Sequence, residues 1–205
     1  MSVANYTDLQ LAVKEWSNRF DTTVAGRVPD FIRLAEERIW QTGERVVRSQ
    51  WGVVSAPLVV PAGQNWVALP ADWLAFARIR SDAQPRIEYM SPDALEDLPQ
   101  PGSAKNYSIE GGRLLYGQTP GADLSLTAKY YADPGLLEVV GTTWLIKKAP
   151  SIYLYASLLE AAIFVKNSAK VSEFGSLLDK ALVGFDSVER ASVISGSRLR
   201  TPGRF

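Results

Sequence analysis

The sequence predicts an α+β fold in which two helix pairs form a four-helix bundle and a β-rich segment is inserted between the second and third helices. Apolar residues recur at helical spacing at both ends of the chain, and Pro, Gly and β-branched residues are frequent between them. The simplest packing brings the two terminal helix pairs together. We expect 1–50 and 142–191 to form the bundle, 51–141 the insertion and 192–205 an extended tail.

The two N-terminal helices are predicted from their start signals and apolar faces. Thr7 and Gln10 have the spacing of a capping box, so the first helix is expected to begin at Thr7. The second is expected to open at Pro29, which suits a first helical turn, and to stop near Gly43. The intervening segment 21–30 is predicted as a loop. The apolar faces are Leu9, Val13, Trp16 and Phe20 in the first helix, and Phe31, Leu34, Ala35 and Ile39 in the second.

The middle segment is predicted to contain short strands separated by turn residues. The clearest is 124–132, where apolar and polar residues alternate. Gly111 and Gly112 predict a tight hairpin turn, and Ser91 followed by Pro92 predicts the start of a short helix. The other predicted strands are 52–61, 65–70, 75–81, 86–90, 106–112 and 113–117.

Residues 144–167 are nearly all apolar, so they could cross a membrane, fill a core or bind a partner. A membrane span needs about 20 apolar residues, and charged residues interrupt this run. We therefore predict a single buried helix with Pro150 in its first turn. Such a helix must be covered by its own chain, by a partner or by both. The interrupting charges are Lys147, Lys148, Glu160 and Lys166, and the semi-polar stripe is Tyr153, Ser157, Glu160 and Phe164.

The composition argues against catalysis and against dedicated nucleic-acid binding. Lys+Arg and Asp+Glu both number 22, so the formal net charge is zero, whereas nucleic-acid binders show a basic excess. The chain has no His and no Cys, which removes the commonest general base, the commonest metal ligand and any disulfide. Glycine motifs for phosphate binding and the serine nucleophile motif are also missing. We expect no enzymatic activity, no cofactor and no metal, and the N-terminus predicts no secretory signal.

Two groups of residues could still form a site. Glu36 and Glu37 are adjacent acids, but neighbours on a helix point about 100° apart, so we expect both to be solvated. Aromatic residues of the β-rich segment could stack against a sugar, although such residues also fill cores. These aromatics are Trp66, Trp73, Tyr130 and Tyr131.

The tail 192–205 contains three Arg residues and no acidic residue, and it has too little apolar content to fold by itself. A fourth helix, predicted to start at Ser168, precedes it. From the residues alone, the tail is either a frayed terminus or a segment that orders on a partner, with contact to DNA phosphates as a third interpretation. The candidate contact residues are Arg198, Arg200 and Arg204 for carboxylates, and Leu199 and Phe205 as apolar anchors.

Six segments in one order, spanning about 5–188, carry a resemblance to a known family. They are YTDLQLAVKEWSNR, VPDFIRLAEERIW, LPADWLAFARIR, IEYMSPDAL, YSIEGGRLLYGQTPGADLSLTAKYYADPGLL and WLIKKAPSIYLYASLLEAAIFVKN. Together they resemble the phage head-to-tail adaptors, also called connector or tubular tail proteins of short-tailed phages. Each segment is a packing pattern rather than a catalytic signature, so the resemblance rests on the collinear set.

The resemblance implies a structural protein of the virion at the head-to-tail junction, present in the host cytoplasm during assembly. It implies a dodecameric ring of identical copies beneath the portal protein, a platform for a downstream tail or nozzle protein, and a channel for genome DNA without sequence-specific binding or membrane contact. The segment 192–205 would dock on the portal through Arg198, Leu199, Arg200, Arg204 and Phe205. A carbohydrate- or surface-binding module using the aromatics of the β-rich segment is the main alternative. A DNA-binding protein and a hydrolase are the others.

Overall fold

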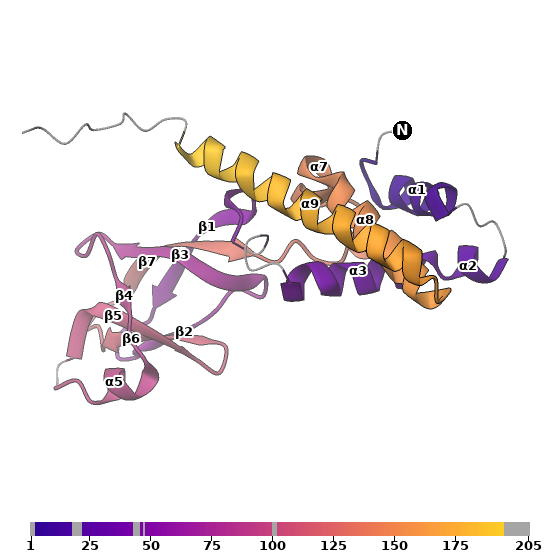
Figure 1. Ribbon diagram of the computed structural model, residues 1–205. Helices are drawn as coiled ribbons and strands as arrows, with labels where there is room; N and C mark the ends of the chain where they lie inside the picture. The colour runs from indigo at the N-terminus through magenta and orange to yellow at the C-terminus, as the bar shows by residue number, and fades with distance from the viewer. Residues whose placement is uncertain (1–2, 18–21, 43–45, 47, 100–101, 195–205) are drawn as a thin grey trace, which may run out of the picture. The chain divides into compact units, whose positions relative to one another are not determined.

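The computed structural model describes residues 3–17, 22–42, 46, 48–99 and 102–194 (Figure 1). The chain divides into two compact units. The first, here called the helical unit, comprises Met1–Trp51 and Pro134–Phe205, and the second, the β-rich unit, is Gly52–Asp133. Each unit has its own buried apolar cluster.

The described part of the helical unit contains seven α-helices, several of them short. The first helix, α1, is capped by Asn5 rather than by Thr7: the Asn5 side-chain oxygen accepts from the Asp8 backbone N–H at 2.9 Å, and the Asp8 carboxylate accepts from the Ala4 N–H at 3.1 Å. Part of the segment predicted as a loop forms the short helix α2. The helices are α1 (Tyr6–Ser17), α2 (Thr22–Gly26), α3 (Val28–Thr42), α6 (Leu137–Val140), α7 (Trp144–Lys148), α8 (Pro150–Phe164) and α9 (Ser168–Ile194).

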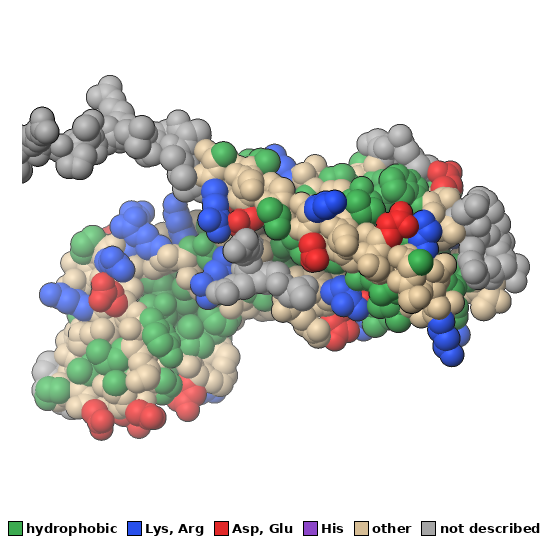
Figure 2. Space-filling model, in the orientation of Figure 1, with side chains coloured by type: hydrophobic (Ala, Val, Ile, Leu, Met, Phe, Trp, Pro, Cys, Tyr) green, Lys and Arg blue, Asp and Glu red, His purple; other side chains and the backbone are tan. Residues whose placement is uncertain are grey.

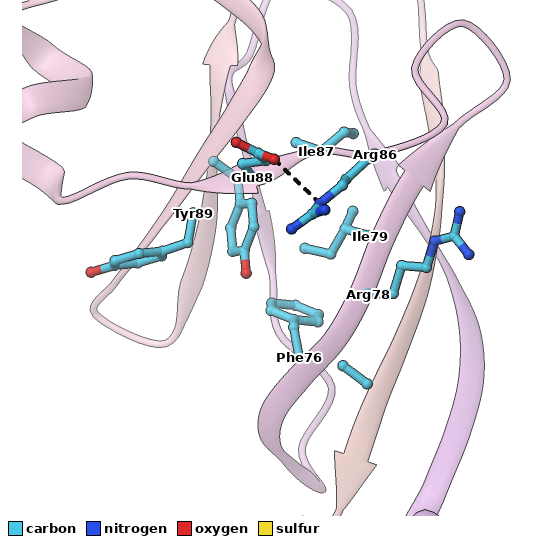
Figure 3. A pocket seen from close by; sticks show the side chains of 9 residues that line it. Phe76, Arg78, Ile79, Arg86, Ile87, Glu88 and Tyr89 are labelled. Atoms are coloured by element: carbon cyan, nitrogen blue, oxygen red, sulfur yellow. Dashed lines mark ion pairs between the residues drawn. The ribbon is translucent and has the colours of Figure 1, made fainter. Parts of the chain in front are cut away.

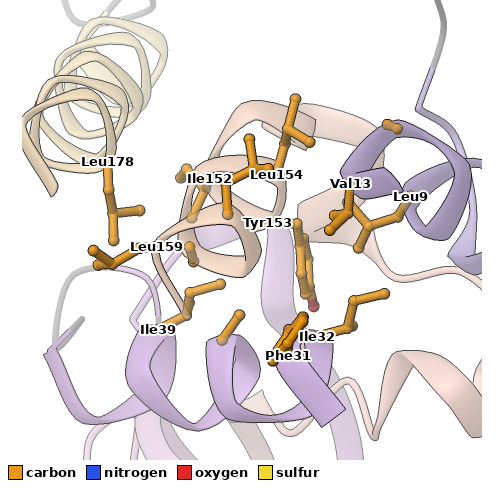
Figure 4. Packing of buried hydrophobic residues seen from close by; sticks show 14 of the residues in the cluster. Leu9, Val13, Phe31, Ile32, Ile39, Ile152, Tyr153, Leu154, Leu159 and Leu178 are labelled. Atoms are coloured by element: carbon orange, nitrogen blue, oxygen red, sulfur yellow. The ribbon is translucent and has the colours of Figure 1, made fainter. Parts of the chain in front are cut away.

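Helix α8 is the centre of the helical unit, and its own chain covers it. It packs against α1, α3, α7 and α9, and 10 of its 15 residues are buried. Figure 4 shows Tyr153 projecting from α8 toward Phe31 and Ile32 of α3. Residues 144–167 therefore fill a core, as one of the three possibilities predicted. No helix in the described part of the chain has the length and hydropathy that a membrane span requires.

The semi-polar stripe of α8 is largely buried and satisfied by hydrogen bonds. The Ser157 hydroxyl donates to the backbone oxygen of Tyr153 at 2.8 Å, and Glu160 accepts from Arg38 Nε of α3. Phe164, at the end of the helix, is the exposed member of the stripe. Burial of the polar atoms costs little here because each retains a partner.

The predicted single helix over 144–167 is two helices with a break at Ala149. Ala149 has φ −142° and ψ 64°, which is not helical. Proline disfavours the helical conformation in the residue before it, and it favours the first position of a new helix. Pro150 therefore ends α7 and starts α8 at the same place.

The described part of the β-rich unit contains two sheets and one short helix, α5 (Pro92–Glu96). One sheet has the order β1-β7-β3, with both pairs antiparallel, and the other has the order β2-β6-β5-β4, with β4 parallel to β5. Gly111 and Gly112 have φ 54° and 74°, as a two-residue hairpin turn requires. The strands are β1 (Val53–Val60), β2 (Trp66–Ala68), β3 (Trp73–Ser81), β4 (Glu88–Tyr89), β5 (Gly102–Glu110), β6 (Arg113–Gln118) and β7 (Leu124–Ala132).

The predicted four-helix bundle with one β-rich insertion is wrong. The described chain is α+β with eight α-helices and two sheets of three and four strands. The four predicted helices became seven in the described part of the helical unit: Pro150 divides the predicted third helix into α7 and α8, and α2 and α6 form in segments where no helix was predicted. Helices α1, α3, α7 and α9 pack against a central, largely buried α8 instead of forming four equal columns.

Candidate functional site

The predicted portal-binding residues lie outside the part of the chain that the structure describes. Helix α9 extends to Ile194, so the first residues of the predicted tail, from Ser192, are helical. Arg198, Leu199, Arg200, Arg204 and Phe205 all lie beyond it. Their contact with the portal stays a prediction.

The four aromatic residues considered for sugar stacking do not form one platform. Trp66 is on β2 of the four-stranded sheet. The central carbon of the Arg113 guanidinium lies over the Trp66 ring, 4.2 Å from the ring centroid. Trp73, Tyr130 and Tyr131 are on the other sheet. Tyr130 is only 4% exposed and donates its hydroxyl to Asp72 at 2.9 Å. Burial and this hydrogen bond raise the pKa of Tyr130.

A different set of aromatic rings connects the two sheets. The Phe76 ring on β3 lies 5.3 Å from the Trp73 ring and 5.7 Å from the Tyr107 ring on β5. The Tyr107 ring lies 5.8 Å from the Tyr89 ring on β4. Such ring pairs stabilise packing by about 0.5–1.5 kcal/mol each beyond their burial. These aromatics therefore support the fold first, and Tyr89 remains exposed at the end of the row.

A pocket of about 660 Å³ lies beside this row, with Phe76 and Ile79 on one wall (Figure 3). Arg86 and Glu88 pair across its rim at 3.2 Å, and both are exposed. Burial raises the pKa of the Tyr107 hydroxyl, which keeps it neutral. The pocket can hold an apolar group by contact. Its lining joins no nucleophile to a base, so the described residues there offer no catalytic arrangement.

A buried acid in the helical unit holds a second candidate surface in place. Glu36 of α3 is 3% exposed, and its Oε1 accepts from the backbone N–H of Leu137, the first residue of α6, at 2.8 Å. The prediction that Glu36 is solvated is therefore wrong. Its neighbour Glu37 is exposed, as predicted, and accepts from Gln41 at 2.8 Å.

The C-terminal end of α6 is fastened to the start of the chain. The Tyr6 backbone N–H donates to the Gly141 carbonyl at 2.9 Å, and the Thr142 hydroxyl donates to the Ala4 carbonyl at 3.2 Å. Burial, followed by the charge of Glu138, raises the pKa of the Tyr6 hydroxyl. These contacts hold a short helix that is too small to be stable alone.

Three exposed apolar residues lie in α6 and at the position just before it, alongside the exposed acid Glu138. Val139 is 79% exposed, and Leu136 and Val140 are also exposed. We call Leu136, Val139 and Val140 the α6 apolar turn. An exposed apolar group on a rigid frame is a feature of protein contact sites. Other exposed apolar residues of the helical unit are Leu11, Trp16, Leu34, Trp51, Ile163, Phe164, Val183 and Val188.

A comparison with protein families identifies the family of the chain. The family model of the SU10 adaptor protein matches residues 4–202. The chain belongs to the SU10 adaptor protein family. This match covers nearly the whole chain and confirms the resemblance to phage head-to-tail adaptors. No curated protein matches the sequence.

Membership in an adaptor family implies a structural protein of the phage virion. Within the described residues, no group of three His, Cys, Asp or Glu side chains could hold a metal ion.

Sequence reasoning missed the α6 apolar turn, although a local signal was present. Gly135 and Gly141 enclose the run 136–140, and both have positive φ, at 75° and 73°. Glycine is favoured in that conformation, so two glycines around a short apolar run could have indicated a tight, exposed turn. The bond from Glu36 joins residues far apart in the sequence, so no local pattern could have shown it.

Proposed function

We propose that this adaptor forms a ring between the portal protein and the tail, and that the ring extends the channel for genome DNA. The proposal rests on the family and on one structural observation, the α6 apolar turn. Copies in a ring contact each other through two different surfaces of the same chain. We take the dodecameric ring that the resemblance implies as the assembly, with a downstream tail or nozzle protein below it.

The α6 apolar turn is suited to such a contact because it is already ordered. Glu36 holds its N-terminal end, and the Tyr6 N–H holds the carbonyl of Gly141 at the other. Contacts made by ordered groups lose less conformational entropy on binding than contacts made by mobile ones. Burying one Val side chain completely contributes about 1.5–3 kcal/mol.

The apolar helix α8 does not supply the contact between copies. Its apolar faces are buried by α1, α3 and α9 of the same chain. Its exposed apolar residues are confined to its C-terminal end, at Ile163 and Phe164. We therefore assign the contact between copies to the α6 apolar turn and not to α8.

The segment 192–205 is proposed to dock on the portal through Arg198, Leu199, Arg200, Arg204 and Phe205. Ordering a segment on binding costs about 2–5 kcal/mol, which the buried interface must offset. Repetition around the ring strengthens attachment, because each further tail binds at a high effective concentration.

The test compares Val139→Asp with the control Val59→Asp, which changes an exposed Val of the β-rich unit. Each protein is mixed with the cognate portal, and the assembled complexes are counted by electron microscopy. We expect Val139→Asp to raise the concentration needed for assembly by at least about tenfold, because a carboxylate is costly to bury in an apolar contact. The control should assemble as the native chain does. Equal assembly by both variants would remove the α6 apolar turn from the contact.

A further inference from the structure

The outer face of the β1-β7-β3 sheet is basic. On β7, Leu126, Ala128 and Tyr130 are buried in the unit, so the residues between them point outward. Lys129 is exposed on this outer side. Arg78 and Arg80 of β3 are exposed on either side of the buried Ile79. The three strands contain no Asp or Glu, so their charge is entirely positive.

The strand register brings these basic residues together. Arg78 lies directly opposite Lys129, and Arg80 lies opposite Thr127. On the other side of β7, Ser55 of β1 lies opposite Lys129. Like charges directly opposite each other in a sheet are destabilising, by an amount comparable to the roughly 0.2–1 kcal/mol of a favourable pair. The fold therefore keeps an arrangement that costs stability.

The charges surround a shallow hollow without a carboxylate. The hollow has a volume of about 70 Å³, and its lining consists of Arg78, Arg80, Thr127 and Lys129. Arg78 donates to the Pro85 carbonyl at 3.1 Å, which holds its guanidinium in place. Among the described residues, neither Arg80 nor Lys129 forms an ion pair, and Asp82, two positions after Arg80, forms none either. Figure 2 shows Lys and Arg side chains gathered on one side of the β-rich unit.

The lining indicates the ligand. Arg, Lys and Thr side chains are the usual donors to phosphate oxygens, and the hollow has no apolar residue of the kind that anchors protein contacts. We propose that this face binds phosphate groups of the DNA backbone, without regard to sequence. The choice of DNA rests on the proposed function, since a channel for the genome would bring duplex DNA to the chain.

The binding should be weak for one chain and strongly dependent on salt. Each phosphate neutralised contributes about −0.9 to the slope of log K against log salt concentration. Three basic residues predict a contribution of about −2.7 from this face. Low affinity for each copy is compatible with DNA that must move.

The test measures binding of a fluorescent DNA duplex of arbitrary sequence to the full chain by anisotropy, over a series of salt concentrations. The variant Arg80→Gln with Lys129→Gln is compared with Lys105→Gln, which removes an exposed Lys from β5 of the other sheet. Every protein keeps 192–205, so its three Arg residues contribute equally. We expect the double variant to reduce the slope by about 1.8 and the Lys105 variant to leave it unchanged.

Several results would overturn the proposal. The first is an absence of DNA binding at low salt. The second is a salt slope in the double variant equal to that of the native chain. The third is a reduction of the slope in the Lys105 variant as large as that in the double variant. Inorganic phosphate is titrated separately: binding of phosphate without DNA would make the site one for a free anion. Binding only to an acidic protein would assign the face to a protein partner. Portal attachment is measured on the same variants, and its failure in the native chain would contradict the ring while leaving this result intact.

Discussion

At the scale of single residues, the structure depends on a few polar side chains whose burial the sequence does not show. Glu36 and Glu37 are both acidic and adjacent, yet one is buried and the other exposed. Acidic residues are rarely buried unless paired, so the expectation of two solvated residues followed the general rule. The exception arises because α6 starts beside Glu36, and the backbone N–H of Leu137, the first residue of α6, needs an acceptor.

Glu36→Ala should lower the free energy of unfolding of the helical unit by about 1–3 kcal/mol, because the Leu137 N–H would lose its buried acceptor. Urea unfolding followed by circular dichroism measures the change. Glu37→Ala is the control. It removes an exposed carboxylate one position away and should change stability by less than about 0.5 kcal/mol. Similar losses in both variants would show that the bond to Leu137 contributes nothing.

At the scale of helices and strands, most local patterns predicted the observed elements. All seven predicted strands are present in the described chain, and the two-glycine turn joins β5 to β6. The alternation predicted over 124–132 is present in β7, where Leu126, Ala128 and Tyr130 are buried. The missed elements are short: α2, α6 and the separate α7 have five residues or fewer. Helices of that length are stable only through tertiary contacts, which a local pattern does not contain.

The account of α8 as a core helix predicts a difference between two residues of the same type. Ile152 is 0% exposed and Ile163 is 43% exposed. Ile152→Ala should lower the free energy of unfolding by about 2–5 kcal/mol, since it leaves a cavity. Ile163→Ala, the matched control on the same helix, should cost less than about 1 kcal/mol. A large effect on ring assembly from Ile152→Ala at unchanged stability would instead place α8 in a contact between copies.

At the scale of the whole molecule, the sequence predicted the family better than the architecture. The collinear segments indicated a phage adaptor because they record an order of elements, and the family match agrees. The bundle prediction failed because helical periodicity shows that a face is buried, not which partners bury it. Pairing of distant strands, such as β1 with β7, likewise divided the β segment into two sheets.

Net charge likewise did not predict where the charged residues gather on the surface. The chain is neutral overall, and neutrality argued against a dedicated nucleic-acid binder. The net charge does not show whether positive and negative residues lie on different parts of the surface, however. The strands β3 and β7 carry only basic charges and β1 carries none, whereas α5 carries only acidic ones, at Asp93 and Glu96. Where the charged residues lie on the surface can be seen only from the folded structure.

The central claim is that this chain works through contacts between copies and with the portal protein. Electron microscopy of the purified chain mixed with its cognate portal tests this most directly. We predict closed rings stacked coaxially on the portal, and a chain truncated after Ile194 should lose most of this attachment. A native chain that stays a single particle and ignores the portal at every concentration would contradict the claim.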